Sequence, residues 1–361
     1  MRVLHVAEIL PGGVSSYLSD LLPHQVDSLG AGQIAILGPH NQLDHIPEIV
    51  GLERFGFARS RRSLRSTAAL FQRLRKVSRT FNPDIVHLHS SFAGLVGRLP
   101  GAFAGSPRPG IVYTAHGWAI DPSRPSKHHS LLVGVEKALA SRCDVIINIS
   151  EHESAFLGPF GFPREKLRYV LTGLGAGHAQ HGVDPHGVTD GPIRLLFAGR
   201  LDFQKAFDLL YPELLALPAG SIICRVAGSR TGDDERVYPS LANVTMLGWL
   251  SRTEVLRELM ECDALIMPSR WEGMPISALE AMRAAKPVFA SNRGPFPALL
   301  EDGIDGVLMD IDKPGFLAKA LQGQTRETLA RMGKAARARF EDRHRSETMA
   351  GKIEQIYRQL R

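Results

Sequence analysis

The chain is predicted to fold as two α/β domains, each built on a doubly wound parallel sheet. Short apolar runs alternate with helical patterns along both halves, as expected for parallel strands joined by crossover helices. The 361 residues are 44% hydrophobic, which is enough to bury two separate cores. Two strand starts also match each other, Arg-Cys-Asp-Val-Ile-Ile at 142–147 and Glu-Cys-Asp-Ala-Leu-Ile at 261–266. This match indicates that the second half repeats the plan of the first.

Each half contains five apolar runs of strand length. In the first half they are Val3–Ala7, Gln33–Leu37, Ile85–His89, Ile111–Ala115 and Val145–Ile149. In the second half they are Arg194–Ala198, Ser221–Ala227, Val244–Leu247, Ala264–Met267 and Pro287–Ala290. The stretch between the halves is rich in glycine and histidine and has no sustained period, which is typical of a linker. We therefore expect a first domain at 1–172, a linker at 173–192 and a second domain at 193–345.

The final segment, 346–361, is expected to be helical because its apolar residues recur at helical spacing. Two placements stay open for this helix. It either ends the second domain or crosses back onto the first.

The charge is unevenly distributed, and the cysteine content indicates a protein of a reducing compartment. The formal net charge is +6, and the whole surplus lies in residues 1–180. The three cysteines show neither metal-ligand spacing nor an even count for disulfides. The first residues are not expected to form a signal peptide, and no apolar run reaches the roughly 20 residues that span a bilayer. We expect a cytoplasmic protein.

The most informative stretch follows Ala264–Met267, which is predicted to be a buried strand. Glu272 and Glu280 stand eight positions apart, and Pro275 between them predicts the start of a helix. Free amides and the helix dipole at such a start attract an anion, while a loop carboxylate suits neutral hydroxyls. This arrangement favours a nucleotide sugar, with the sugar near Glu272 and the ribose near Glu280. The expected donor-binding residues here are Gly273, Met274, Pro275, Ile276, Ser277 and Glu280.

Two basic residues follow another strand of the second half. Arg200 and Lys205 lie in Gly-Arg-Leu-Asp-Phe-Gln-Lys, directly after Arg194–Ala198. Doubly wound sheets bind ligands at the carboxyl ends of their strands. Arg200 is suited to fork onto phosphate oxygens, and Lys205 adds a compact second charge. A surface salt bridge is the alternative use of this pair.

These motifs together resemble the Glu-x7-Glu pattern of the retaining family-4 glycosyltransferases. Residues 262–282 carry most of the resemblance, in the phrase Cys-Asp-Ala-Leu-Ile-Met-Pro-Ser-Arg-Trp-Glu-Gly-Met-Pro-Ile-Ser-Ala-Leu-Glu-Ala-Met. The resemblance implies the GT-B fold, two Rossmann-like domains facing a central cleft. It also implies that Arg200 and Lys205 bind the donor diphosphate. Two positions depart from the family: Ala206 stands where glycine is usual, and Thr-Gly-Leu-Gly at 172–175 replaces an Asn-Gly pair.

The first half offers weaker motifs. Gly12 and Gly13 open a helix after the first strand, where paired glycines let backbone amides approach an anion. The resemblance implies that this loop faces the donor and that His116, in His-Gly at the end of a strand, approaches the transferred sugar. His89 is expected to line the same cleft, and His87 to face the other side of its strand. Ser150 and Glu151 are two further expected cleft residues.

The expected chemistry is transfer of a sugar to a hydroxyl with retention at the anomeric carbon. Charge develops on the departing diphosphate, so the positive groups Arg200 and Lys205 and the helix start carry catalysis. The resemblance implies that Glu272 orients sugar hydroxyls and is not a nucleophile. His116, Glu272, Arg200 and Lys205 form the expected catalytic set. No metal and no other cofactor is expected, because the lone Asp-x-Asp at 310–312 suits a helix-entry turn.

The segment 58–80 holds eight basic residues and no acidic one. Leu64, Ala68, Phe71, Leu74 and Val77 recur at helical spacing and predict an apolar face that packs on the first sheet. The arginines are then either solvated or in contact with an anionic membrane, at the inner face of which the protein would be peripheral. Nucleic-acid binding is not expected, since no recognisable module accompanies the charge.

The expected partners are a nucleoside-diphosphate sugar and a saccharide or polyprenyl-linked acceptor. Two other classes stay open. A nucleotide-sugar 2-epimerase has the same fold, and a non-catalytic nucleotide-sugar-binding protein would use the same donor residues. The base, the sugar, the acceptor, the linkage and the oligomeric state cannot be predicted from the sequence.

Overall fold

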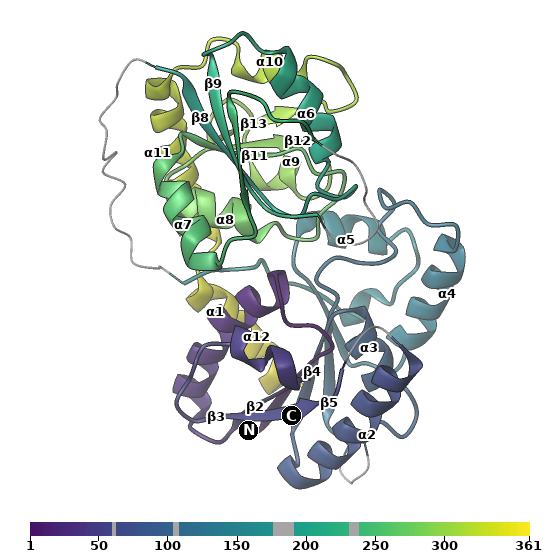
Figure 1. Cartoon of the computed structure of the whole chain (residues 1–361). Coiled ribbons are helices and arrows are strands. Elements are labelled where there is room, and N and C mark those ends of the chain that lie inside the picture. Colours follow the sequence, from purple (N-terminus) through teal and green to yellow (C-terminus); the bar gives the residue numbers. More distant parts are fainter. Residues whose placement is uncertain (60–62, 104–107, 176–190, 231–237) are drawn as a thin grey trace. The chain divides into compact units, whose positions relative to one another are not determined.

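The computed structural model describes residues 1–59, 63–103, 108–175, 191–230 and 238–361, which divide into two compact units (Figure 1). The first unit is Met1–Gly175 together with Arg345–Arg361, and the second is Ala176–His344. Each unit has one fully parallel sheet with helices on both of its faces, so the predicted fold class is confirmed.

The first unit has a seven-stranded sheet in the order β3-β2-β1-β4-β5-β6-β7. Its strands are β1 (Val3–Ala7), β2 (Ile34–Pro39), β3 (Leu52–Phe57), β4 (Ile85–His89), β5 (Gly110–Thr114), β6 (Val145–Asn148) and β7 (Leu167–Tyr169). Its α-helices are α1 (Gly13–Leu29), α2 (Leu64–Phe81), α3 (Ser91–Gly97), α4 (His129–Ala140), α5 (Glu151–Leu157) and α12 (Ser346–Gln359). The 3-10 helices are His40–His45 and Arg164–Lys166.

The second unit has a six-stranded sheet in the order β10-β9-β8-β11-β12-β13. Its strands are β8 (Ile193–Ala198), β9 (Ile222–Ala227), β10 (Val244–Gly248), β11 (Ala264–Met267), β12 (Val288–Ser291) and β13 (Gly306–Met309). Its helices are α6 (Phe207–Ala216), α7 (Arg252–Glu261), α8 (Ile276–Arg283), α9 (Phe296–Leu299), α10 (Phe316–Leu321) and α11 (Arg326–Arg343). Both sheets reverse their direction of growth beside their first strand, between β1 and β4 and between β8 and β11.

All ten strands expected above are present, and the structure has three more, β3, β7 and β13. Of these, β3 and β7 have no strand-like apolar run in the sequence. β3 carries Leu-Glu-Arg-Phe-Gly-Phe and β7 only Leu-Arg-Tyr, and both lie at the edges of the sheet. Edge strands are half exposed and tolerate charge, so they lack the apolar run that marks a central parallel strand.

The matching strand starts of the two halves perform the same structural task. Asp144 Oδ2 accepts the amide of Ile111 at 2.7 Å, and Asp263 Oδ2 accepts the amide of Arg194 at 2.8 Å. In each unit, the aspartate before one strand therefore caps the first residues of a neighbouring strand. The similarity of the two halves extends from sequence to hydrogen bonding.

A lysine makes an equivalent set of hydrogen bonds in each of the two units. Lys166 Nζ donates to the carbonyl of Cys143 and Lys286 Nζ donates to that of Cys262, both at 2.8 Å. Each lysine thereby satisfies carbonyls at the carboxyl end of a helix, where a positive charge is favourable. Both cysteines, like Cys224, are buried free thiols.

Helix α12 packs against α1 in the first unit, although α11 before it belongs to the second (Figure 1). His24 Nε2 lies 2.8 Å from Ser346 Oγ, and Ser28 Oγ donates to Glu354 at 2.9 Å. Of the two placements left open by the sequence, the structure shows the return to the first domain. Gly173–Gly175 also belong to this unit, whereas 176–190 of the expected linker lie outside the described residues.

Gly173 is expected to be intolerant of any side chain. A Cβ at this position would lie 2.3 Å from the carbonyl oxygen of Arg345, at the start of α12. Gly173→Ala should lower the free energy of unfolding by about 1–3 kcal/mol, because the backbone must move apart. Chemical denaturation measures the effect. Gly134→Ala is the control, since a Cβ there meets no atom within 4 Å apart from the adjacent backbone of its own helix. Equal stability of the two variants would contradict the prediction.

The prediction of which face of α2 is buried is wrong in part. Leu74 and Val77 are buried, but Leu64 is 89% exposed and Ala68 is also exposed. The buried face contains Ser66, Leu70, Leu74, Val77, Ser78 and Phe81. The buried face is thus rotated about the helix axis from the predicted one. It includes two small serines, Ser66 and Ser78, which a pattern of apolar residues does not mark. No helix in the described part of the chain is both long and apolar enough to cross a membrane.

Candidate active site

The donor-site residues predicted in the second half come together at one edge of the second sheet. The loop after β8 carries Arg200 and Lys205, and the loop after β11 carries Glu272. β8 and β11 are hydrogen-bonded neighbours at the point where the strand order reverses. Ligands of open α/β sheets bind at this point, outside the carboxyl ends of the strands.

Lys205 and Glu272 form a close ion pair. Lys205 Nζ lies 2.5 Å from Glu272 Oε1, and the two side chains are only 17% and 8% exposed. Arg200 is more open, at 44%, and contacts Asp202 and Gln204 at 3.0 and 2.8 Å. Gln204 in turn donates to the carbonyl of Trp271 at 3.1 Å, so it connects the two loops. An accessible guanidinium therefore lies near a half-buried ammonium and a buried carboxylate.

Glu280 lies on α8, which begins one residue later than predicted. Pro275 is the N-cap, Ile276 is the first helical residue, and no side chain caps the first turn of this helix. That turn also has no acidic residue, so its amides and dipole are available to an anion. Glu280 is buried, and Oε1 accepts from Arg252 Nε at 2.7 Å. Sequence reasoning missed Arg252, because it lies 28 positions from its partner with no motif around it.

Ala206 keeps the backbone conformation that favours glycine. Its φ of 57° and ψ of 35° are left-handed, and it caps the start of α6. An alanine can adopt this region at a cost of roughly 1–2 kcal/mol. The departure from the family's glycine therefore leaves the left-handed turn after Lys205 in place.

The loop after β11 is also held by Arg270, which is not among the residues predicted for the site. Its guanidinium makes two 2.9 Å bonds to the carboxylate of Asp208 and lies 3.8 Å from the ring centroid of Phe203. This contact joins the loop after β8 to the loop after β11. Arg270 is thus a structural residue beside the predicted site.

The first unit repeats this arrangement between β1 and β4. Gly12 follows β1 with φ 93° and ψ −141°, a conformation that glycine adopts readily and other residues rarely do. Gly13 begins α1. His89 is the last residue of β4, and His116 follows β5. The expected first-domain residues thus gather at the carboxyl edge of this sheet.

His116 lies in a strained turn that a buried carboxylate holds. The φ angles of His116 and Gly117 are 55° and 102°. Glu153 accepts the amides of Gly117 and Ile149 at 3.0 and 2.9 Å, and burial raises its pKa to about 7. Ser150 is buried as the N-cap of α5 and accepts the amide of Glu153 at 3.2 Å. Glu153 was not predicted, and Glu151, which was, is exposed.

His87 was predicted on the opposite side of β4, and this prediction is wrong. Residues two apart in a strand share a face, and the rings of His87 and His89 lie 4.1 Å apart. His87 Nδ1 is 2.6 Å from Tyr357 Oη, and Nε2 is 2.8 Å from Thr114 Oγ1. It belongs to a buried histidine cluster that also includes His5 of β1.

Three of these imidazoles, His5, His87 and His89, lie within reach of one cation, with ligand atoms inside 4.8 Å. Every ring nitrogen of the three already faces a hydrogen-bonding partner. These hydrogen bonds therefore explain why the three rings lie together, and they require no ion. The acids of the Asp-x-Asp segment are also paired, Asp310 with Lys313 and Asp312 with Arg293.

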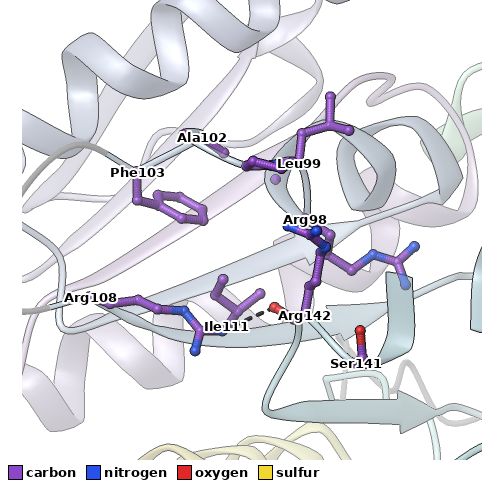
Figure 2. A pocket seen from close by; sticks show the side chains of 11 residues that line it. Arg98, Leu99, Ala102, Phe103, Arg108, Ile111, Ser141 and Arg142 are labelled. Atoms are coloured by element: carbon purple, nitrogen blue, oxygen red, sulfur yellow. Dashed lines mark hydrogen bonds between the residues drawn. The ribbon is translucent and has the colours of Figure 1, made fainter. Parts of the chain in front are cut away.

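A cavity of about 380 Å³ lies at the other edge of the first sheet, near the amino ends of β5 and β6 (Figure 2). Arg98, Arg108 and Arg142 contribute to its lining. Arg98 is committed to a buried bond with Glu136 at 2.7 Å. None of the predicted site residues lines this cavity.

Both halves of the chain match models of known families. Residues 11–176 match the model described as "Glycosyltransferase Family 4", and residues 183–339 match "Glycosyl transferases group 1". The matched segments contain every site residue predicted from the sequence.

Two curated relatives show how far the similarity extends. An uncharacterised 41.2 kDa protein of the cps region of Klebsiella pneumoniae is 26% identical over 99% of both chains. An Escherichia coli UDP-Gal:alpha-D-GlcNAc-diphosphoundecaprenol alpha-1,3-galactosyltransferase is 24% identical over 70% of this chain and 67% of its own.

Solved structures share the whole architecture. Sucrose-phosphate synthase of Thermosynechococcus elongatus superimposes with a TM-score of 0.81 at 18% identity, covering 100% of this chain and 99% of that one. Anabaena HepE in complex with UDP-glucose gives 0.80 at 19% identity and covers 99% of both chains. These likenesses show the GT-B fold.

Proposed function

Because the chain belongs to the group 1 and family 4 glycosyltransferases, we propose that it transfers a hexose from a nucleoside-diphosphate sugar to a hydroxyl of a saccharide or polyprenyl-linked acceptor. The observation that carries the proposal is the Lys205–Glu272 pair, beside the uncapped start of α8 at the strand reversal. A cation, a carboxylate and free helix amides together suit a diphosphate joined to a polyhydroxylated ring.

In the proposed mechanism, Arg200, Lys205 and the α8 start bind the diphosphate and stabilise the charge that develops as it leaves. Glu272 accepts hydrogen bonds from sugar hydroxyls, and Glu280 accepts them from the ribose. His116 contacts the transferred sugar, with the Gly12–Gly13 loop beside it. The acceptor oxygen bonds to the anomeric carbon on the face that the diphosphate leaves, which retains the configuration. The acceptor proton goes to a departing phosphate oxygen.

The class of donor and acceptor is supported by the named relatives. HepE was solved with UDP-glucose, and the Escherichia coli relative acts on a diphosphoundecaprenol-linked sugar. We propose the same classes for this chain, in polysaccharide biosynthesis. Neither comparison selects the base, the sugar or the acceptor.

The test has two arms. A thermal-shift screen of nucleoside diphosphates and their sugars should find a donor that stabilises the protein by about 2.7 kcal/mol at 100 times its Kd. The donor is then incubated alone and with saccharide or polyprenyl-linked acceptors, with and without EDTA. Acceptor-dependent nucleoside diphosphate release that survives EDTA supports the proposal. Conversion of the donor without acceptor supports the epimerase, and binding without turnover supports a non-catalytic protein.

We also propose that the 58–80 segment touches an anionic membrane, which would place the protein at the inner face. Leu64 is 89% exposed beside the exposed Arg65 at the start of α2, while 60–62 lie outside the described residues. Each basic residue near such a surface contributes roughly 1 kcal/mol. Flotation with anionic vesicles should exceed that with neutral vesicles, and Arg65→Glu with Lys76→Glu should abolish the difference. Equal flotation with both lipids would end the proposal.

A further inference from the structure

A line of hydrogen bonds runs through the first unit to His116. Gln25 Oε1 on α1 lies 2.7 Å from His5 Nε2, and His5 Nδ1 lies 3.0 Å from His89 Nε2. His89 Nδ1 lies 2.9 Å from His116 Nε2. Gln25, His5 and His89 are buried, and only His116 is partly exposed. Each intermediate ring uses both nitrogens in this line.

The line has one direction. The Gln25 amide oxygen only accepts, so His5 must carry its proton on Nε2 and present a lone pair on Nδ1. His89 then donates from Nε2 and accepts on Nδ1, which leaves His116 to donate from Nε2. A neutral His116 therefore keeps its lone pair on Nδ1.

We propose that Gln25, His5 and His89 form a positioning relay that fixes the tautomer and ring orientation of His116. The proposal rests on the function proposed above, in which His116 contacts the transferred sugar. In this tautomer, Nδ1 of His116 accepts a hydrogen bond from a sugar hydroxyl. No hydrogen bond within the described residues occupies that nitrogen.

The surroundings of the relay keep it neutral and ordered. Burial lowers the pKa of His5 to about 4 and holds the pKa of His89 well below its usual range. Tyr17 meets the His116 ring edge-on at 4.7 Å. Tyr357 of α12 reaches the cluster through its contact with His87, whose ring lies against that of His89. The returning helix thus helps to cover the relay.

The strained turn of His116 explains the need for such support. Its backbone is left-handed, and the amide after it is held by Glu153. These contacts fix the backbone but leave the imidazole free to rotate and to change tautomer. The hydrogen bond that His116 Nε2 donates to His89 Nδ1 is the contact that distinguishes one ring nitrogen from the other.

The proposal is tested by two-bond ¹H–¹⁵N NMR of the histidine-labelled full chain without substrate, with His116 assigned by comparison with His116→Gln. The wild-type His116 should carry its proton on Nε2. Gln25→Met keeps the side-chain size but removes the acceptor, so both tautomers should appear. Gln25→Glu keeps an accepting oxygen and should restore the single tautomer.

Kinetics supply the second readout. Gln25→Met should lower kcat by about 10-fold and change the donor KM by less than about 2-fold. A loss of about 10-fold is typical when a residue that hydrogen-bonds to a metal-bound histidine is replaced. Gln25→Glu should recover most of kcat. A wild-type proton on Nδ1, or an unchanged tautomer in Gln25→Met, overturns the relay. Because the tautomer is read without substrate, it holds or fails independently of glycosyl transfer.

Discussion

Lys205→Ala is expected to lower kcat by about 100- to 1,000-fold, the usual effect of removing one group that stabilises transition-state charge. Its ammonium is half-buried and lies 2.5 Å from Glu272, where the diphosphate is proposed to depart. Arg200→Ala should have an effect of similar size, since Arg200 is the accessible cation of the same loop. Steady-state kinetics with the identified donor measure both. Near-normal turnover in both variants would remove these residues from the mechanism.

Loss of stability must be separated from loss of chemistry in this experiment. Lys205→Ala leaves the carboxylate of Glu272, only 8% exposed, without its ion-pair partner. Breaking such a pair destabilises by up to about 3 kcal/mol. Adding Glu272→Gln removes the orphaned charge, so the double variant should regain stability while kcat stays low. Lys313→Ala is the matched control, because its exposed pair with Asp310 lies outside the predicted site.

The fold and the donor loops could be predicted because their determinants are local. Each central strand is a continuous apolar run, and the phrase at 262–282 carries strand, loop and helix start in one segment. Lys205 and Glu272 were both selected by motif, and the structure places them in contact. Their pairing follows from two loops at adjacent strands, so a local pattern was enough.

The rest of the site depends on contacts between distant positions. Gln25 and His5 are 20 positions apart, and His5 and His89 are 84 apart. No local pattern indicates which polar side chains meet inside a unit. Glu153 has no local signal for the same reason, since one of its two amide partners, Gly117, lies 36 positions away. The error on His87 is different: the alternation of a strand already placed it beside His89.

The second large effect concerns acid. Burial lowers the pKa of His5 to about 4 and holds those of His87 and His89 well below 6.5. Unfolding exposes the three rings and restores a pKa near 6.5. Below that pH the unfolded chain binds protons at these rings, and the folded chain does not. The free energy of unfolding should therefore fall as pH falls, by about 1.4 kcal/mol per pH unit for each ring.

Glu153 acts in the opposite direction. Its pKa rises to about 7 in the folded chain, against about 4.3 when unfolded. Between these values the folded chain holds a proton that the unfolded chain releases, so acid favours the folded chain at this residue. On unfolding, the three buried histidines take up three protons and the one carboxyl releases one, so unfolding takes up two protons in total. The net loss between pH 6 and pH 5 is then about 3 kcal/mol, and partly exposed His116, whose pKa burial also lowers, adds to it.

Denaturant titrations at several pH values test this for the first unit. The fluorescence of buried Trp118 reports on it once Trp249 and Trp271 are replaced by phenylalanine. His87→Phe should reduce the slope of stability against pH by about 1.4 kcal/mol per unit, whereas substitution of the exposed His128 by glutamine should leave it unchanged. Stability that is flat from pH 6.5 to pH 5 would mean that the cluster is hydrated and charged. In that event a relay of neutral imidazoles could not exist.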